Sequence, residues 1–81
     1  MNLAQLKRLA AKHDATIEIL NGEEYCIAAD APEGRAWCVD PCRADTGTLI
    51  CEAEPGESKA AVHRDIASRM QRGTQPYVEA S

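Results

Sequence analysis

Phenylalanine is missing from this chain, and the aromatic side chains are limited to Trp37, Tyr25 and Tyr77. Aromatic residues usually supply much of the buried area of a core, so aliphatic side chains must fill most of this interior. The 81 residues suffice for one domain, and a domain of this size buries only about 60% of the surface that its unfolded chain exposes. We expect a single domain, residues 1–73, followed by a flexible tail, residues 74–81.

Long apolar runs are also missing. No stretch approaches the ~20 apolar residues that span a membrane, and the segment from Met1 to Arg8 lacks the uninterrupted apolar core of a secretory signal. The expected compartment is therefore the cytoplasm. Because a reducing cytoplasm keeps thiols free, the four cysteines are not assigned to two disulfides by default.

Basic residues are outnumbered, with nine Lys and Arg against thirteen Asp and Glu, a formal charge of −4 and a pI near 5.0. Binding to a nucleic-acid backbone requires clustered Lys and Arg, so the composition argues against a nucleic-acid partner and favours a basic protein surface. Gly-rich phosphate loops and zinc-protease helix motifs are absent from the sequence. Both histidines, His13 and His63, fall on apolar helix stripes, so we predict a protein that is not an enzyme.

Two segments have the apolar spacing of amphipathic helices. The first covers residues 3–13, with Asn2 as the cap and Gln5 placed to complete a capping box. The second begins at Ser58 and ends before Gly73. Its predicted apolar stripe consists of Val62, His63, Ile66, Ala67 and Met70.

Between the helices, alternation predicts four short strands, over residues 15–20, 24–29, 35–39 and 48–53. Asn21-Gly22 favours a tight hairpin turn between the first two. The predicted fold is α+β: a helix, a three- to four-stranded antiparallel sheet and a second helix, with both helices packed on one sheet face. Residues 40–47 are expected to form a loop.

The turn at Asp30 to Gly34 sets a register in which Ala29 faces Arg35. In this register the bulky residues Ile27 and Trp37 pair on the helix-covered face. The small residues pair on the other face, which we predict to be an apolar interaction face made of Cys26, Ala28, Ala36 and Cys38. A polar rim for it is available from Thr16, Glu18, Thr48 and Glu52. Such a face suits a protein partner or a second copy of the chain, unless the tail or the 40–47 loop covers it.

The order of elements resembles that of the double-stranded RNA-binding domain, and Ser58-Lys59-Ala60-Ala61 lies where that family begins its second helix. The resemblance implies two helices on one sheet face and RNA as a partner. The family's lysine cluster is reduced here to Lys59 and Arg64, however. The loop between the first two strands, Asn21-Gly22-Glu23-Glu24, carries two acidic residues that would repel phosphate.

The cysteines allow three interpretations. In the first, Cys51 is a small core residue, the others are ordinary strand or loop residues, and the protein holds no cofactor. In the second, zinc is bound by Cys26, Cys38, Cys42 and Cys51, or by some of them with His13 or His63. In the third, Cys26 and Cys38 form a cross-strand disulfide. The first is our expectation, because the cysteine spacing is incomplete for a structural zinc site.

Together these features predict a small cytoplasmic accessory or inhibitor protein, of the kind that small accessory genes, including phage-borne ones, encode. It would act without catalysis, by binding another protein through the open sheet face. The alternative from a different class is a zinc-stapled module associated with nucleic acid.

Overall fold

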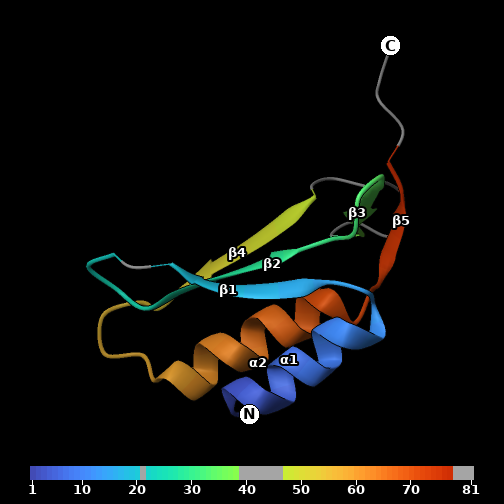
Figure 1. The fold of residues 1–81 in the computed structure, drawn as a ribbon. Coiled ribbons are helices and arrows are strands. Elements are labelled where there is room, and N and C mark those ends of the chain that lie inside the picture. The colour runs from blue at the N-terminus through green and yellow to red at the C-terminus, as the bar shows by residue number, and fades with distance from the viewer. Residues whose placement is uncertain (21, 39–46, 78–81) are drawn as a thin grey trace.

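The computed structural model (Figure 1) describes residues 1–20, 22–38 and 47–77. Its elements, in chain order, are α1 (Leu3–Lys12), β1 (Thr16–Leu20), β2 (Cys26–Asp30), β3 (Arg35–Trp37), β4 (Thr48–Glu52), α2 (Lys59–Met70) and β5 (Thr74–Pro76). This order confirms the predicted α+β fold. Within the described ranges, neither helix has the length and apolar character needed to cross a bilayer.

The main sheet has the strand order β1-β2-β4 and is antiparallel throughout. Ile27 in the central strand β2 lies opposite Ile19 of β1 on one side and Cys51 of β4 on the other. Figure 1 shows α1 and α2 side by side beneath one face of this sheet, where α1 contacts β1 and α2 contacts β2 and β4. The placement of both helices on one face is therefore confirmed.

Local chemistry accounts for the ends of both helices. The Asn2 side chain accepts a hydrogen bond from the backbone N–H of Gln5, and the Gln5 side chain accepts one from the N–H of Asn2, each 2.9 Å long. Ser58 caps α2 by accepting from the N–H of Ala61. Gly73 follows α2 with φ +80°, a left-handed conformation that glycine adopts without strain. The predicted caps are confirmed.

The predicted hairpin between residues 24–29 and 35–39 is wrong. The second edge of β2 pairs with β4, so that Ala28 lies opposite Ile50, while β3 forms a separate two-stranded sheet with β5 in which Trp37 lies opposite Thr74. β4 pairs with β2 along five residues and so satisfies the backbone hydrogen-bonding groups of the whole second edge of β2, while β3 pairs with β5 along three residues.

The pairing of β3 with β5 also means that part of the predicted C-terminal tail is a strand. Residues 74–76 form a strand where the sequence predicted a flexible tail over 74–81, and the N–H of Tyr77 donates to the carbonyl oxygen of Gly34 at 2.9 Å. Val39, most of the predicted 40–47 loop and the final residues 78–81 lie outside the described residues.

The core lies between the main sheet and the helices and is largely aliphatic, as expected. Trp37 is fully buried in it, and its indole N–H donates to the carbonyl oxygen of Ala29 at 2.9 Å. His13 packs edge-on against the indole, with 5.8 Å between ring centroids. The other fully or nearly fully buried members are Leu6, Ala10, Ile27, Ala29, Val62, Ile66 and Met70.

Candidate functional site

The face of the main sheet turned away from the helices is the candidate site. Successive strand residues point to opposite faces, and Ile27, Ala29 and Leu49 belong to the helix-covered core. Their neighbours along each strand therefore point the other way. The register places these neighbours in three rows, which we call the open face: Thr16, Asp30 and Thr48; Glu18, Ala28 and Ile50; Leu20, Cys26 and Glu52.

The middle of the open face is apolar. Ile50 is 59% exposed although it lies at the centre of β4. Ala28, directly opposite on β2, is 3% exposed, and Leu20 and Cys26 are half-buried. An isoleucine that is largely exposed to water contributes little to the stability of the fold, so its side chain is available for contact with another molecule.

The charged groups of the open face all have one sign. Glu18, Asp30 and Glu52 are acidic, and the nine residues include no Lys or Arg. The Thr48 hydroxyl donates to an Asp30 carboxylate oxygen at 2.8 Å, which orients that carboxylate at the edge of the face. The result is an apolar centre with an acidic rim.

The structure brings together only part of the interaction face predicted from sequence. Cys26 is half-buried on the open face, together with the predicted rim residues Thr16, Glu18, Thr48 and Glu52. Ala28 belongs to the same face but is only 3% exposed, so it offers a partner little surface. Ala36 is fully buried in β3, opposite Gln75, so its prediction as a contact residue is corrected. Cys38 follows β3, and its N–H donates to the carbonyl oxygen of Gly73 at 2.9 Å.

Sequence reasoning missed Ile50 and Leu20 as members of this face. The run Leu49-Ile50-Cys51 is apolar without a break, so alternation does not indicate which of its side chains is exposed. The rim residues of the same strand offered a usable signal, because every second side chain along a strand points to the same face. The sequence predicts Thr48 and Glu52 on the open side, and Ile50 lies midway between them, two residues from each, and so points to the same side.

Cys26, Cys38 and Cys51 are free thiols in the structure. Cys26 points to the open face, whereas Cys51 lies opposite Ile27 on the covered face, so these two thiols do not converge on one ion. Among the described residues no three His, Cys, Asp or Glu side chains are grouped to hold a metal. Cys42 lies outside those residues, so both the zinc alternative and the expectation of no cofactor stay predictions.

Burial raises the pKa of the Cys51 thiol from 9.0 to about 11, and the nearby Asp65 carboxylate adds to this effect. Because the folded protein resists ionisation of this thiol, the unfolded chain loses its proton first as the pH rises. We therefore expect the contribution of Cys51 to stability to decline between pH 9 and about 11. Urea unfolding at pH 8 and pH 10.5 measures this decline, which should be smaller in Cys51→Ala.

The same burial predicts an order of reactivity. In the folded protein at pH 8, iodoacetamide should modify the half-buried Cys26 and Cys38 well before Cys51, which is 4% exposed. Mass spectrometry of the peptides over time gives the order. Modification of Cys51 as fast as Cys26 would contradict the placement of Cys51 in the core.

Among the described residues, His63 in α2 is the one buried polar or charged side chain, and it is 5% exposed. Its Nδ1 lies 2.9 Å from the carbonyl oxygen of Met1, and its Nε2 lies 2.8 Å from the Tyr25 hydroxyl. A neutral ring that carries its proton on Nδ1 donates to Met1 and accepts from Tyr25. The Lys59 ammonium lies 5.1 Å from the centre of the Tyr25 ring. His63 thereby joins α2 to both the start of the chain and the segment before β2, which is a structural role.

The charges are divided unevenly between the two layers. Helices α1 and α2 carry six of the nine Lys and Arg residues but one of the thirteen Asp and Glu residues. The acidic character indicated by the net charge therefore belongs to the strands and loops, and the helix layer is basic.

No protein-family model, curated protein or solved structure matches this chain.

Proposed function

We propose that this protein is a noncatalytic accessory or inhibitor protein that binds a basic protein surface through the open face. The observation that carries the proposal is Ile50, a large apolar side chain 59% exposed at the centre of a sheet face that neither helix covers. Interfaces commonly combine such an apolar centre with a polar rim that contributes to specificity. The half-exposed free thiols Cys26 and Cys38 suit a reducing compartment such as the cytoplasm.

The rim charges select the kind of partner. Glu18, Asp30 and Glu52 surround the apolar centre. A second copy of the chain would place this acidic rim against itself, and like charges brought together in an interface disfavour association. A partner with Lys or Arg around an apolar projection would instead meet opposite charges, which steer the encounter and fix its orientation. The basic partner is therefore preferred to the homodimer.

Substitution of Ile50 by arginine tests the apolar centre. Ile50→Arg should weaken capture of the partner from native cell lysate by at least about tenfold, since central apolar contacts dominate interfaces. It should change the free energy of unfolding by less than about 1 kcal/mol, because surface substitutions are usually mild. Tyr77→Arg is the matched control, since Tyr77 is 56% exposed but follows β5, outside the open face. Its capture should equal that of the unmodified protein.

Charge reversal tests the rim. Glu18→Lys combined with Glu52→Lys should abolish the same capture, whereas Glu33→Lys, an exposed position in the turn before β3, should leave it intact. Equal loss in both variants would show that the open face is not the binding surface. Sedimentation of the protein alone provides the other check. A dimer that Ile50→Arg dissociates would show that the face binds a second copy and would overturn the basic partner.

A further inference from the structure

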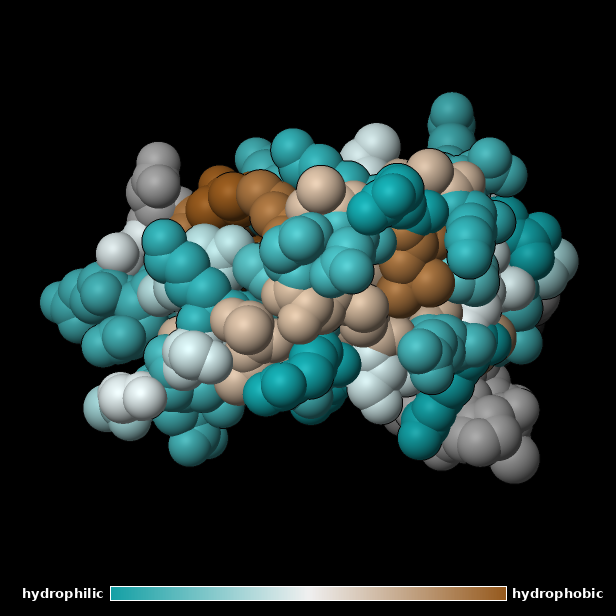
Figure 2. All heavy atoms as spheres, turned by 90° about the horizontal axis from the view of Figure 1, so that it is seen from below, coloured by the Kyte–Doolittle hydropathy of each residue, from teal (hydrophilic) through white to brown (hydrophobic). Residues whose placement is uncertain are grey.

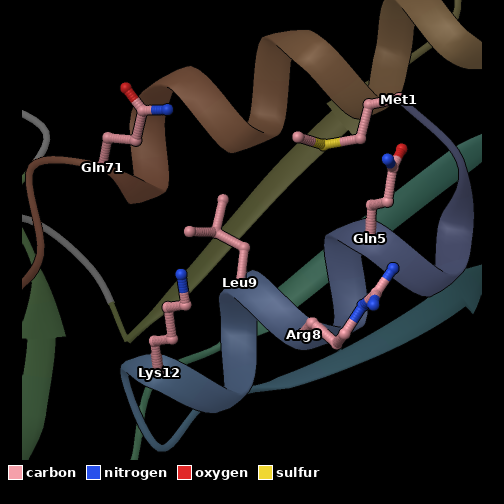
Figure 3. Close-up of a pocket in the computed structure, with 6 residues that line it drawn as sticks. All are labelled: Met1, Gln5, Arg8, Leu9, Lys12 and Gln71. Atoms are coloured by element: carbon pink, nitrogen blue, oxygen red, sulfur yellow. The ribbon is translucent and has the colours of Figure 1, made fainter.

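A groove runs between α1 and α2 on the helix side of the molecule, opposite the open face (Figure 3). Its volume is about 360 Å³. Its lining consists of Met1, Gln5, Arg8, Leu9, Lys12 and Gln71. The α1 members recur at positions 5, 8, 9 and 12, the spacing that places residues on one side of a helix.

The interior of the groove is apolar. Figure 3 shows the side chains of Leu9 and Met1 directed into the space between the two helices, with Gln71 at one end. Leu9 is half-buried, and Met1 is 39% exposed despite its apolar side chain. Figure 2 shows this side of the molecule, on which apolar residues reach the surface between hydrophilic ones. The groove therefore leaves apolar surface in contact with water that a ligand chain could cover.

The charged groups that line the groove are both cations. Arg8 and Lys12 lie one helical turn apart on α1, and no acidic residue is among the six lining residues. Asp65, the single acidic residue within the two helices, is on α2 and pairs with Arg69 at 3.6 Å, so it is engaged away from the lining. Although the chain as a whole has a net charge of −4, the charged side chains that line this groove are positive.

We propose that this groove binds a monomeric single-chain anionic amphiphile of the fatty-acid type. Figure 3 shows Lys12 and Arg8 on either side of Leu9, so the carboxylate would pair with one of these two cations and the acyl chain would cover Leu9 and Met1. A volume of about 360 Å³ falls within the range of small-molecule sites, roughly 300 to 1,000 Å³. A nucleic acid has the negative charge but no flexible apolar chain for the groove. The inference is independent of the open face and its partner.

Titration of the unmodified protein with sodium dodecanoate, below the concentration at which it forms micelles, tests the proposal. Heteronuclear NMR should show saturable shifts at Leu9, Gln5 and Gln71. Two further ligands separate the contribution of the carboxylate from that of the acyl chain. We expect 1-dodecanol, which has the chain without the charge, and sodium butyrate, which has the charge with almost no chain, each to bind at least about tenfold more weakly, since both ends contribute.

Variants locate the anion. Arg8→Gln combined with Lys12→Gln should weaken dodecanoate binding about tenfold, and higher salt should weaken binding to the unmodified protein. Lys7→Gln combined with Arg64→Gln is the matched control, because it removes two exposed helix cations that do not line the groove. Circular dichroism checks that both variants are folded. If either variant is unfolded, the comparison of dodecanoate with dodecanol and butyrate on the unmodified protein still tests the proposal.

Three results would overturn the proposal. The first is dodecanol binding as tightly as dodecanoate, which would leave no role for the cations. The second is an equal loss of affinity in the control variant, which would reduce the effect to general charge. The third is the absence of dodecanoate binding where phosphatidylserine vesicles or a double-stranded RNA do bind, which would assign the basic helix layer to a membrane surface or a nucleic acid.

Discussion

Replacing Trp37 with alanine is expected to lower the free energy of unfolding by about 3 to 5 kcal/mol. Trp37 is the largest fully buried side chain, and it fills the space beside β2 and His13. Its removal leaves a cavity and deprives the carbonyl oxygen of Ala29 of the indole N–H donor. Small domains have total stabilities near the lower end of roughly 5 to 15 kcal/mol. Urea denaturation followed by circular dichroism should therefore show a variant that is largely unfolded at low urea concentrations.

A milder substitution at the same position separates volume from hydrogen bonding. Trp37→Phe keeps most of the apolar ring but removes the N–H, so it should cost roughly half as much as Trp37→Ala. A loss below about 1 kcal/mol for Trp37→Ala would be incompatible with a fully buried indole at this position.

The second large effect is a loss of stability on truncation of a buried isoleucine, and an exposed isoleucine provides the control. Ile66 in α2 is fully buried against the main sheet, whereas Ile50 on the open face is 59% exposed. Ile66→Ala should destabilise the protein by about 2 to 5 kcal/mol, because it opens a cavity in the core. The chemically identical change Ile50→Ala should cost less than about 1 kcal/mol, since an exposed side chain has little transfer free energy to lose.

Denaturant unfolding of both alanine variants, analysed with a common m-value, measures the difference. Similar losses at the two positions would mean that Ile50 is covered, and the open face would then not be available to a partner. The comparison therefore tests whether Ile50 is exposed on the open face, as the proposed function requires, before a partner has been identified.

Elements defined by local chemistry were predictable from the sequence. The capping box of Asn2 and Gln5 and the serine cap at Ser58 depend on residues within one helical turn, so neighbours in sequence decide them. The same holds for the hairpin of β1 and β2, whose strands are close in the chain.

The partner of each strand edge was less predictable. Alternation indicates which side chains share a face, and it correctly separated the buried Trp37 from the half-buried Cys38. It says nothing about which strand lies alongside, because any strand of matching parity can fill the free edge of β2. β4 lies further along the chain than β3 yet takes that edge. The pairing of β3 with β5 joins segments nearly forty residues apart, which no local pattern indicates.

At the candidate site, the structure brings together only some of the residues that the sequence grouped on one face. The rim residues Thr16 and Glu18 were placed by parity alone, and that placement does not depend on which strand neighbours β2. Ala36 was placed through the hairpin register and is instead buried in the second sheet. The exposure of Ile50 depends on which side of β4 the helices cover, which follows from tertiary packing.

The helices and the open face carry charge of opposite sign, because the helices hold six basic side chains against one acidic side chain, whereas the open face holds three acidic side chains and no basic one. A molecule with oppositely charged faces is oriented by the electric field of a charged partner, so it turns its helices toward anions and its open face toward cations. It should be retained at low ionic strength by both anion- and cation-exchange resins near neutral pH, despite a pI near 5.0. In a crowded mixture, anionic molecules would therefore approach the helices and cationic molecules the open face before any specific contact forms.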